Sequence, residues 1–351
     1  DVLVAESSTR PETGGGVLGW VRNRIQRQAG ALAHSADRIT LLRDTDGDGR
    51  VDQRQVFAEH LNQPIGMLLL GDRFYVANTD AVVRFRYAPD AVHVPGEGEV
   101  ILRLPHHAGD NGHWTRALAV SPDETKLYVS VGSSSNIADY GMAVEDRRAA
   151  IWEFNPDGSG ARLYATGLRN PIGIEFAPDT HELWAVVNER DMLGDNLVPD
   201  YITHVQDGAF YGWPYSYFGQ HVDARVTPQR PDLVARAIAP DFAVGAHTAS
   251  LGLHFYRGAL LPARFRQGVF IGQHGSWNRS VRAGYKVVFV PFANGRPSGE
   301  IEDFLTGFLN ARGEAQGRPV GIGEDRTGAL LVADDVGNIV WRVAPVAAPA
   351  H

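Results

Sequence analysis

Apolar residues recur along the whole chain in short runs, separated by glycine, proline and charged residues. Runs of this length, bounded by turn residues, are typical of β-strands, and no long amphipathic helix is indicated. One unit repeats, a short apolar strand that carries a Val-Ala or Val-Ser type of step. Its six copies begin at Asp1, Arg73, Lys126, Glu182, Gly268 and Ala329.

Turn residues connect several copies to a neighbouring apolar run. The sequences at 121–125, 177–181 and 324–328 are typical of hairpin connections, and partner strands are expected at 82–87, 151–154 and 339–343. A periodic array of small antiparallel sheets cannot bury its faces one sheet at a time, so it closes into a ring. We therefore predict an all-β fold, a six-bladed β-propeller of four-stranded antiparallel blades whose first blade is incomplete at the N terminus. A β-sandwich or a solenoid fits six similar units less well.

The composition of the chain indicates its domain organisation and excludes several classes of protein. The chain has 351 residues, of which 44% are hydrophobic and 21% charged, and this even composition predicts a single domain over residues 1–351. A net charge of -8 argues against a nucleic-acid partner. No run approaches the roughly 20 apolar residues of a membrane span. The absence of cysteine excludes disulfides and thiolate chemistry.

An acidic segment at 44–52 carries carboxylates at alternate positions, with glycines that allow the loop to curl. Such a loop can surround a hard cation with oxygen atoms, and an EF-hand would need Glu where the chain has Gln55. We predict a structural calcium loop between two strands; the alternative is a solvated acidic turn, in which the acids would repel one another. The expected ligands are Asp44, Asp46, Asp48, the carbonyl of Arg50 and Asp52.

Three histidines, His106, His107 and His113, precede the strand expected near Leu118. A neutral imidazole at the start of a strand can accept a proton from a hydroxyl group near neutral pH. Each histidine taken alone is equally consistent with a turn or surface position.

A second segment presents a cation at the start of a strand. Pro171 disfavours a helical conformation at Asn170, so Arg169 and Asn170 are expected just where an inner strand begins. The arginine would offer a fixed fork of donors to a carboxylate or a quinone oxygen. A buried ion pair is the alternative.

The sequence Leu168-Arg-Asn-Pro-Ile-Gly173, followed by an acidic loop and then Tyr211-Gly-Trp-Pro214, resembles the glucose/sorbosone dehydrogenase family of propellers that use pyrroloquinoline quinone (PQQ). The similarity extends from about Arg38 to Val343 and is strongest to the sorbosone dehydrogenase branch. The resemblance implies a PQQ-dependent and calcium-dependent oxidation of an aldose or a sugar aldehyde. It also implies a periplasmic or secreted location and a cytochrome or quinone as electron acceptor.

The family's functional residues can be transferred position by position. The resemblance implies that His113 is the general base, which takes the proton of the sugar hydroxyl while hydride passes to C5 of the quinone. Arg169 would stabilise the negative charge on the quinone oxygen, with Asn170 beside it. The carbonyl groups of Asp191 and Met192 would bind the calcium ion, although the family usually has Gly-Pro there. The other cofactor-binding residues would be Gln63, His247, His274 in the place nearest the family's lysine, and Arg318.

One departure concerns the acid that often precedes the catalytic histidine in the family. Gly112 occupies that position here, and Asp110 is a candidate substitute. Trp114, Trp213 and Trp277 could offer flat faces to a sugar or to the quinone, but for Trp213 we favour a role in packing or as a wall of the site.

Two other functions compete with a dehydrogenase. A calcium-dependent lactonase or esterase propeller would need side-chain acids from several blades around one metal. A non-catalytic propeller that binds a ligand through its rim would have no use for His113, Arg169 and Arg318 at strand starts. The fold alone decides between none of these.

Overall fold

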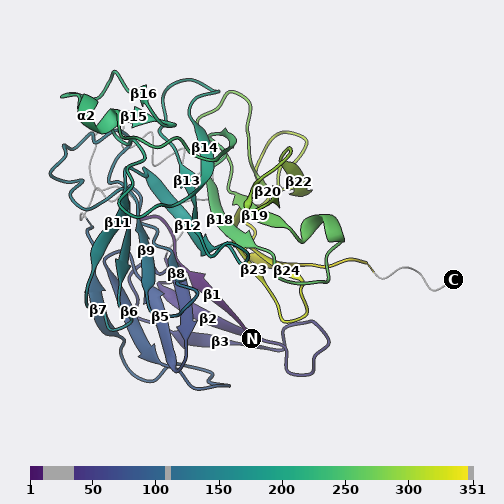
Figure 1. The fold of residues 1–351 in the computed structure, drawn as a ribbon. Coiled ribbons are helices and arrows are strands. Elements are labelled where there is room, and N and C mark those ends of the chain that lie inside the picture. Colours follow the sequence, from purple (N-terminus) through teal and green to yellow (C-terminus); the bar gives the residue numbers. More distant parts are fainter. Residues whose placement is uncertain (11–34, 107–111, 347–351) are drawn as a thin grey trace. The chain divides into compact units, whose positions relative to one another are not determined.

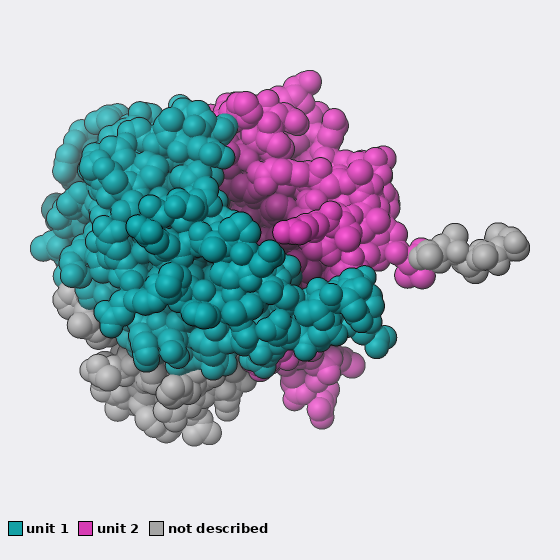
Figure 2. Space-filling view, turned by 90° about the horizontal axis from the view of Figure 1, so that it is seen from below, with its two compact units in different colours: residues 1–174, 206–238 teal, residues 175–205, 239–351 magenta. Residues whose placement is uncertain are grey.

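The computed structural model describes residues 1–10, 35–106 and 112–346. Their regular secondary structure is almost entirely β-strand, with one short α-helix, α2 (Pro231–Val234), and one 3-10 helix, η1 (Ala263–Phe265) (Figure 1). They contain six antiparallel sheets of three or more strands and one small two-stranded sheet, β15 (Ser216–Tyr217) with β16 (His221–Val222). The chain divides into two compact units, residues 1–174 with 206–238 and residues 175–205 with 239–351 (Figure 2). The single domain expected from composition stays a prediction.

The first unit holds three sheets in which strands adjacent in sequence are paired. The first has three strands among the described residues and the other two have four; the expected incompleteness of the first blade stays a prediction. The strands are β1 (Val2–Glu6), β2 (Arg38–Arg43) and β3 (Gln53–Ala58); β4 (Gly66–Leu70), β5 (Arg73–Ala77), β6 (Ala81–Arg86) and β7 (Glu99–Arg103); and β8 (Leu118–Val120), β9 (Leu127–Val131), β10 (Ala150–Phe154) and β11 (Arg162–Thr166).

The second unit holds the other three sheets, and the boundary between the units falls within β12 (Asn170–Phe176). The last of these sheets has three strands, where four were expected. The strands are β12, β13 (Leu183–Asn188), β14 (Pro199–His204) and β17 (Phe242–Ala246); β18 (Ser250–Phe255), β19 (Gly268–Gln273), β20 (Lys286–Ala293), β21 (Arg296–Pro297) and β22 (Glu302–Leu305); and β23 (Pro319–Glu324), β24 (Leu330–Asp334) and β25 (Ile339–Val343).

The repeated sequence unit marks a fixed place in the sheets. Five of its six copies form the second strand of a sheet, namely β5, β9, β13, β19 and β24, and the copy at Asp1 forms β1, an edge strand paired with β2. The predicted hairpin turns at 121–125, 177–181 and 324–328 connect the first and second strands of their sheets. The predicted fold class, a six-bladed β-propeller of antiparallel blades, is confirmed.

Apolar side chains are buried between neighbouring sheets rather than within one sheet. In the first unit, Tyr75 and Val82 pack with Val129 and Trp152 of the next sheet. In the second unit, a cluster centred on Trp184 joins the sheet of β13 to the sheet of β18 and β19. Burial of side chains of this size contributes on the order of 2–3 kcal/mol each. Each sheet is therefore stabilised through its neighbours, as the sequence pattern predicts.

Connections at one end of each sheet position the candidate functional residues. In an antiparallel sheet, the start of the first strand and the end of the second strand lie at the same edge. The described residues include no helix long and apolar enough to cross a membrane.

Candidate active site

The residues predicted to bind cofactor or to catalyse occupy equivalent places in their sheets. Each lies just before or at the start of a first strand, or just after a second strand, so within its own sheet each lies at the same end. Gln63 precedes β4, His113 precedes β8, Arg169 and Asn170 stand at the start of β12, His247 precedes β18 and Arg318 precedes β23, whereas Asp191 and Met192 follow β13 and His274 follows β19.

His113 is partly buried and is held by Ser133, which lies two residues after the end of β9. Its Nδ1 atom lies 2.9 Å from the carbonyl oxygen of Ser133 and 2.9 Å from the hydroxyl oxygen of the same residue. The ring is therefore anchored by one nitrogen to the loop that follows the neighbouring strand.

Two buried arginines support the backbone around His113, and no sequence motif marks either of them. Arg116 is fully buried and donates to the carbonyl oxygens of His113 (2.9 Å) and Thr115 (2.7 Å). Arg148 donates to the carbonyl oxygens of Gly132 (3.1 Å) and Ser133 (3.1 Å). Burial lowers the pKa of Arg148 to about 10 and lowers the pKa of Arg116 as well. Both guanidinium groups thus hold in place the backbone of the two loops that meet at His113.

Arg169 lies beside the same loop. Its Nε and Nη2 atoms donate to the main-chain oxygen (3.2 Å) and the side-chain oxygen (3.0 Å) of Asn136, and only 4% of the residue is exposed. The carbonyl oxygen of Arg169 accepts a hydrogen bond of 2.8 Å from the Ser133 amide. The indole of Trp213, also buried, donates to the Asn136 carbonyl at 2.9 Å. Trp213 thus packs beside Arg169 as a wall, in agreement with the role we favoured for it.

Asn170 presents a buried amide that the rest of the described chain does not satisfy. Its Oδ1 atom is buried and has no hydrogen-bond partner. A Cβ atom at Gly132 would lie 2.3 Å from this oxygen and 2.6 Å from the Cβ atom of His113, so only glycine allows both side chains to approach. An unsatisfied buried acceptor costs about 1–3 kcal/mol, so this oxygen can gain a hydrogen bond from a donor.

Gln63 has a different set of contacts. Its Nε2 atom donates to the Ser8 carbonyl at 2.9 Å, and its backbone amide donates to Asp37 at 3.1 Å. The side chain therefore ties the segment after β1 to the segment before β4. Its predicted contact with a cofactor stays a prediction.

In the second unit, Arg318 is buried under the loop that follows β19. Its Nε and Nη2 atoms each donate at 2.8 Å, to the carbonyl oxygens of His274 and Gly275, and its guanidinium carbon lies 5.3 Å from the ring centre of Tyr285. The remaining nitrogen, Nη1, has no hydrogen bond to a described residue, and burial lowers the pKa of the group. Arg318 therefore retains a donor for an anionic ligand.

His274 differs from the lysine that it was expected to replace. Its Nε2 atom pairs with Asp335 at 2.8 Å, and burial, followed by the charge of Arg318, lowers the pKa of the imidazole. The side chain thus tends to be neutral, so it offers a hydrogen bond where a lysine would offer a cation.

Asp191, in the loop after β13, contacts His247, which lies between β17 and β18. The Asp191 carboxylate accepts from Asn278 (2.8 Å) and lies 3.3 Å from Nδ1 of His247, which raises the pKa of the histidine. The Asp191 carbonyl oxygen accepts a hydrogen bond of 2.9 Å from Arg190, and Met192 is exposed with a φ of 73°. A guanidinium group directed at this carbonyl competes with the expected calcium ion, and the pair of carbonyl ligands stays a prediction.

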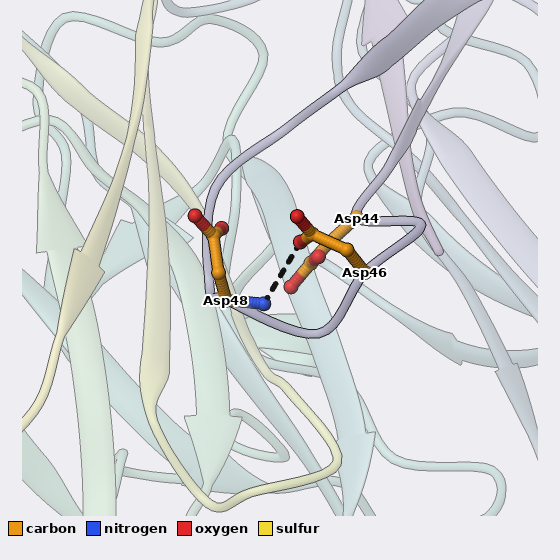
Figure 3. Close-up of side chains that lie close together, drawn as sticks. All are labelled: Asp44, Asp46 and Asp48. Carbon is orange, nitrogen blue, oxygen red and sulfur yellow. Dashed lines mark hydrogen bonds between the residues drawn. The ribbon is translucent and has the colours of Figure 1, made fainter.

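The acidic loop connects β2 to β3, as predicted, and is exposed throughout. Figure 3 shows carboxylate groups of Asp44, Asp46 and Asp48 side by side, with oxygen atoms within 4.8 Å of one another. Asp44 also accepts from the amides of Gly47 (2.7 Å) and Gly49 (2.8 Å). Asp52 lies outside this group of three, because its carboxylate accepts from the amide and hydroxyl of Thr45, both at 2.7 Å.

The other aromatic and histidine candidates have plain structural positions or lie outside the described residues. His106 is exposed, and His107 and Asp110 fall in the part of the chain that is not described. The Trp114 indole donates to the Thr9 hydroxyl at 3.0 Å, and Trp277 is half exposed.

The described residues thus place a loop-anchored histidine, an unsatisfied buried acceptor and two buried arginines at the ends of propeller sheets. The chain belongs to the TrAA12-like family, whose model matches residues 26–209 and 220–344. This match confirms the resemblance to the PQQ-dependent sugar dehydrogenases; the sorbosone branch stays a prediction.

Individual relatives agree with this assignment. An uncharacterized protein of Borreliella burgdorferi is 29% identical over 296 residues, which cover 82% of this chain and 76% of that protein. The holo form of the pyranose dehydrogenase PQQ domain from Coprinopsis cinerea superposes with a TM-score of 0.75 at 22% identity, covering 89% of both chains. The calcium structure of a Trichoderma reesei enzyme of carbohydrate-active family AA12 has a TM-score of 0.73 at 19% identity and covers 87% of both chains. At these identities the structural likeness shows the fold.

Proposed function

We propose that the protein is a PQQ-dependent sugar dehydrogenase that oxidises an aldose or a sugar aldehyde of the sorbosone type, with His113 as general base. The observation that carries the proposal is the buried, unsatisfied side-chain oxygen Oδ1 of Asn170, a residue that shares the space beside Gly132 with His113 and follows Arg169 directly. Family membership and the names of the relatives, a pyranose dehydrogenase PQQ domain among them, support it.

The residues fit a flat, anionic quinone cofactor. PQQ carries three carboxylates and two quinone carbonyls, so its binding site needs donors more than acceptors. Arg169 and Arg318 are buried cations with planar donor groups, and Arg318 retains an unused Nη1 donor. The Asn170 amide can pair with the edge of a ring, and we propose that Gln63, His247 and His274 supply further polar contacts.

The chain's own groups would act as follows. PQQ, when bound, supplies the acceptor for the electron pair that leaves the sugar carbon. His113 would accept the proton of the sugar hydroxyl through its other ring nitrogen, since Ser133 holds the ring at Nδ1. Arg169, held in place by Asn136, stabilises negative charge on an oxygen atom of the acceptor.

Calcium has two proposed places in the chain. The carbonyl groups of Asp191 and Met192 would bind the ion that accompanies the cofactor, which requires Arg190 to move from the Asp191 carbonyl. Asp44, Asp46 and Asp48, with Arg50 and Asp52, would bind a structural ion in the exposed loop. The calcium structure of the Trichoderma reesei family member supports calcium as the metal.

The partners follow from the same family assignment. We propose a sugar as substrate, a cytochrome or a quinone as electron acceptor, and a periplasmic or secreted location. The rival lactonase needs acidic metal ligands at the strand starts. Among the residues that the structure describes, the one group of three acids or histidines close enough to share a metal is the exposed loop at Asp44, Asp46 and Asp48. This arrangement favours the dehydrogenase.

The proposed function can be tested by reconstituting the protein with PQQ and calcium. PQQ and calcium are added to the metal-free protein, the absorbance of bound quinone is recorded, and aldoses are supplied with an artificial dye as acceptor. We expect dye reduction that requires both additions. Calcium-dependent hydrolysis of lactones without quinone, or no activity in either assay, would contradict the proposal.

A pair of variants sharpens this test. Asn170→Ala removes the unsatisfied amide and should weaken PQQ binding by about fivefold to a hundredfold, the loss of one or two hydrogen bonds. Asn338→Gly is the control, because Asn338 is exposed and its φ of 53° suits glycine. Equal PQQ affinity in the two variants would remove Asn170 from the cofactor site.

A further inference from the structure

We infer that Ser133 fixes His113 in the single neutral form that can act as a base, so that a serine replaces the acid expected beside the histidine. The inference rests on the proposed function, in which His113 is the base. It assigns Ser133 as a positioning residue, since Ser133 touches the imidazole and acts through it.

The carbonyl group of Ser133 determines which ring nitrogen of His113 carries the proton. Nδ1 of His113 lies 2.9 Å from the carbonyl oxygen of Ser133. A carbonyl oxygen can only accept a hydrogen bond, so Nδ1 must carry the hydrogen. In the neutral imidazole the other nitrogen, Nε2, then has the free electron pair. A base needs this electron pair, and it lies on the side of the ring away from Ser133.

The hydroxyl group of Ser133 also contacts the imidazole of His113. Its oxygen also lies 2.9 Å from Nδ1, and its own hydrogen is directed to the carbonyl oxygen of Ser135 at 2.7 Å. The hydroxyl oxygen is thus left to accept from Nδ1, in the same sense as the carbonyl. Ser133 is fully buried, so water cannot replace either acceptor. The carbonyl and hydroxyl oxygens of Ser133 therefore both favour the form of His113 that is protonated at Nδ1.

Charged side chains hold the backbone around His113 and Ser133. Arg116 and Arg148 hold the backbone carbonyls of His113 and Ser133, and Glu145 pairs with Arg148 and accepts from the Ser134 and Ser135 amides. Each of these three side chains forms hydrogen bonds with backbone atoms. The two contacts of Ser133 with the imidazole are made by neutral acceptor atoms, the carbonyl oxygen and the hydroxyl oxygen.

The Ser133 amide also donates to the carbonyl oxygen of Arg169 at 2.8 Å. The same residue that orients His113 therefore sets the spacing between the base and the segment that carries Arg169 and Asn170.

The direct test reads the imidazole itself. The chain is labelled with ¹⁵N-histidine, and the His113 signals are assigned by comparison with His113→Gln. We expect the nitrogen shifts of a neutral ring protonated at Nδ1, in protein without cofactor or substrate. A ring protonated mainly at Nε2 would overturn the inference, whatever the enzyme assays show. In Ser133→Ala, which keeps only the carbonyl acceptor, a measurable fraction of the Nε2-protonated form is expected.

The kinetic test compares two buried serines of the same segment. Ser133→Ala should lower kcat of the reconstituted enzyme by about threefold to tenfold, the value of one lost hydrogen bond, with little change in KM or PQQ affinity. Ser130→Ala is the matched control, because Ser130 is equally buried and its hydroxyl accepts from Ala117 instead. Equal kcat in the two variants would overturn the positioning role. A correct nitrogen signal with no activity under any condition would instead contradict the proposed function.

Discussion

The acidic loop at 44–52 and the group around Ser133 are two polar regions of the same unit with opposite construction. The loop has the sharpest sequence motif in the chain, yet its side chains are exposed and hydrogen-bond chiefly to the loop's own backbone. The group around Ser133 has little local motif. Its contacts join His113, Arg148 and Arg169, which are far apart in sequence, and most of its members are buried.

The difference shows where each region derives its geometry. A loop that closes on itself needs only its own residues, so its sequence reveals it and the rest of the protein barely depends on it. A buried polar group is positioned by packing, and every unsatisfied atom in it carries a cost. We therefore expect changes around Ser133 to affect activity and stability strongly, and changes in the loop to affect them weakly.

The largest effect is expected for His113→Ala. Loss of a general base lowers turnover by about two to four orders of magnitude, whereas PQQ binding, which depends on Arg169 and Asn170, should be nearly unchanged. The measurement is kcat of the reconstituted enzyme together with a PQQ titration. A decrease of less than fivefold would remove His113 from the role of base.

Arg148→Met should have the next largest effect, on stability. The change leaves Glu145 buried without its cation and removes a hydrogen-bond donor from each of the carbonyl groups of Gly132 and Ser133. The free energy of unfolding should fall by roughly 3–5 kcal/mol, measured by denaturant titration. Arg50→Met, in the exposed loop, is the control and should change it by less than about 0.5 kcal/mol. Similar losses in both variants would contradict the contrast between the two regions.

The two regions should also respond to pH with opposite sign. Burial raises the pKa of Glu145, so its contribution to stability is present at low pH and is lost as pH rises through the folded-state pKa. Hydrogen bonds from Thr45 lower the pKa of Asp52, so its contribution is present above the unfolded-state pKa and is lost as pH falls.

The corresponding measurement is the free energy of unfolding of wild type, Glu145→Gln and Asp52→Asn from about one unit below to about three units above an ordinary carboxyl pKa, roughly pH 3 to pH 7. The advantage of wild type over Glu145→Gln should shrink as pH rises, and its advantage over Asp52→Asn should grow. Parallel trends would show that the two carboxyl groups have similar environments.

The smallest effect is expected from calcium binding to the acidic loop. At a free concentration ten times the dissociation constant, calcium should stabilise the protein by about 1.4 kcal/mol. The double change Asp46→Asn with Asp48→Asn should abolish this gain, whereas Asp72→Asn, at another exposed acid, should leave it intact. An unchanged calcium response in the double variant would favour the solvated acidic turn.

Much of the fold and part of the site could be predicted without a structure. Turn residues and short apolar runs placed the hairpins correctly, because strand spacing and turn chemistry are local properties. The positions of His113, Arg169 and Arg318 at strand starts followed from the same pattern. The sequence gives no local signal for Ser133, Arg116 or Arg148, since a serine or an arginine looks the same whether it faces solvent or a buried carbonyl.

By itself, then, the sequence determined the class of fold, the order of strands and turns, the family and a short list of residues at the ends of strands. Only the tertiary structure decided that Gln63 ties two segments together, that His274 is held by an acid, and that His113 is anchored by Ser133. The physical reason is that strand patterns depend on neighbours in sequence, whereas the state of a buried polar group depends on which distant atoms packing brings within hydrogen-bond distance.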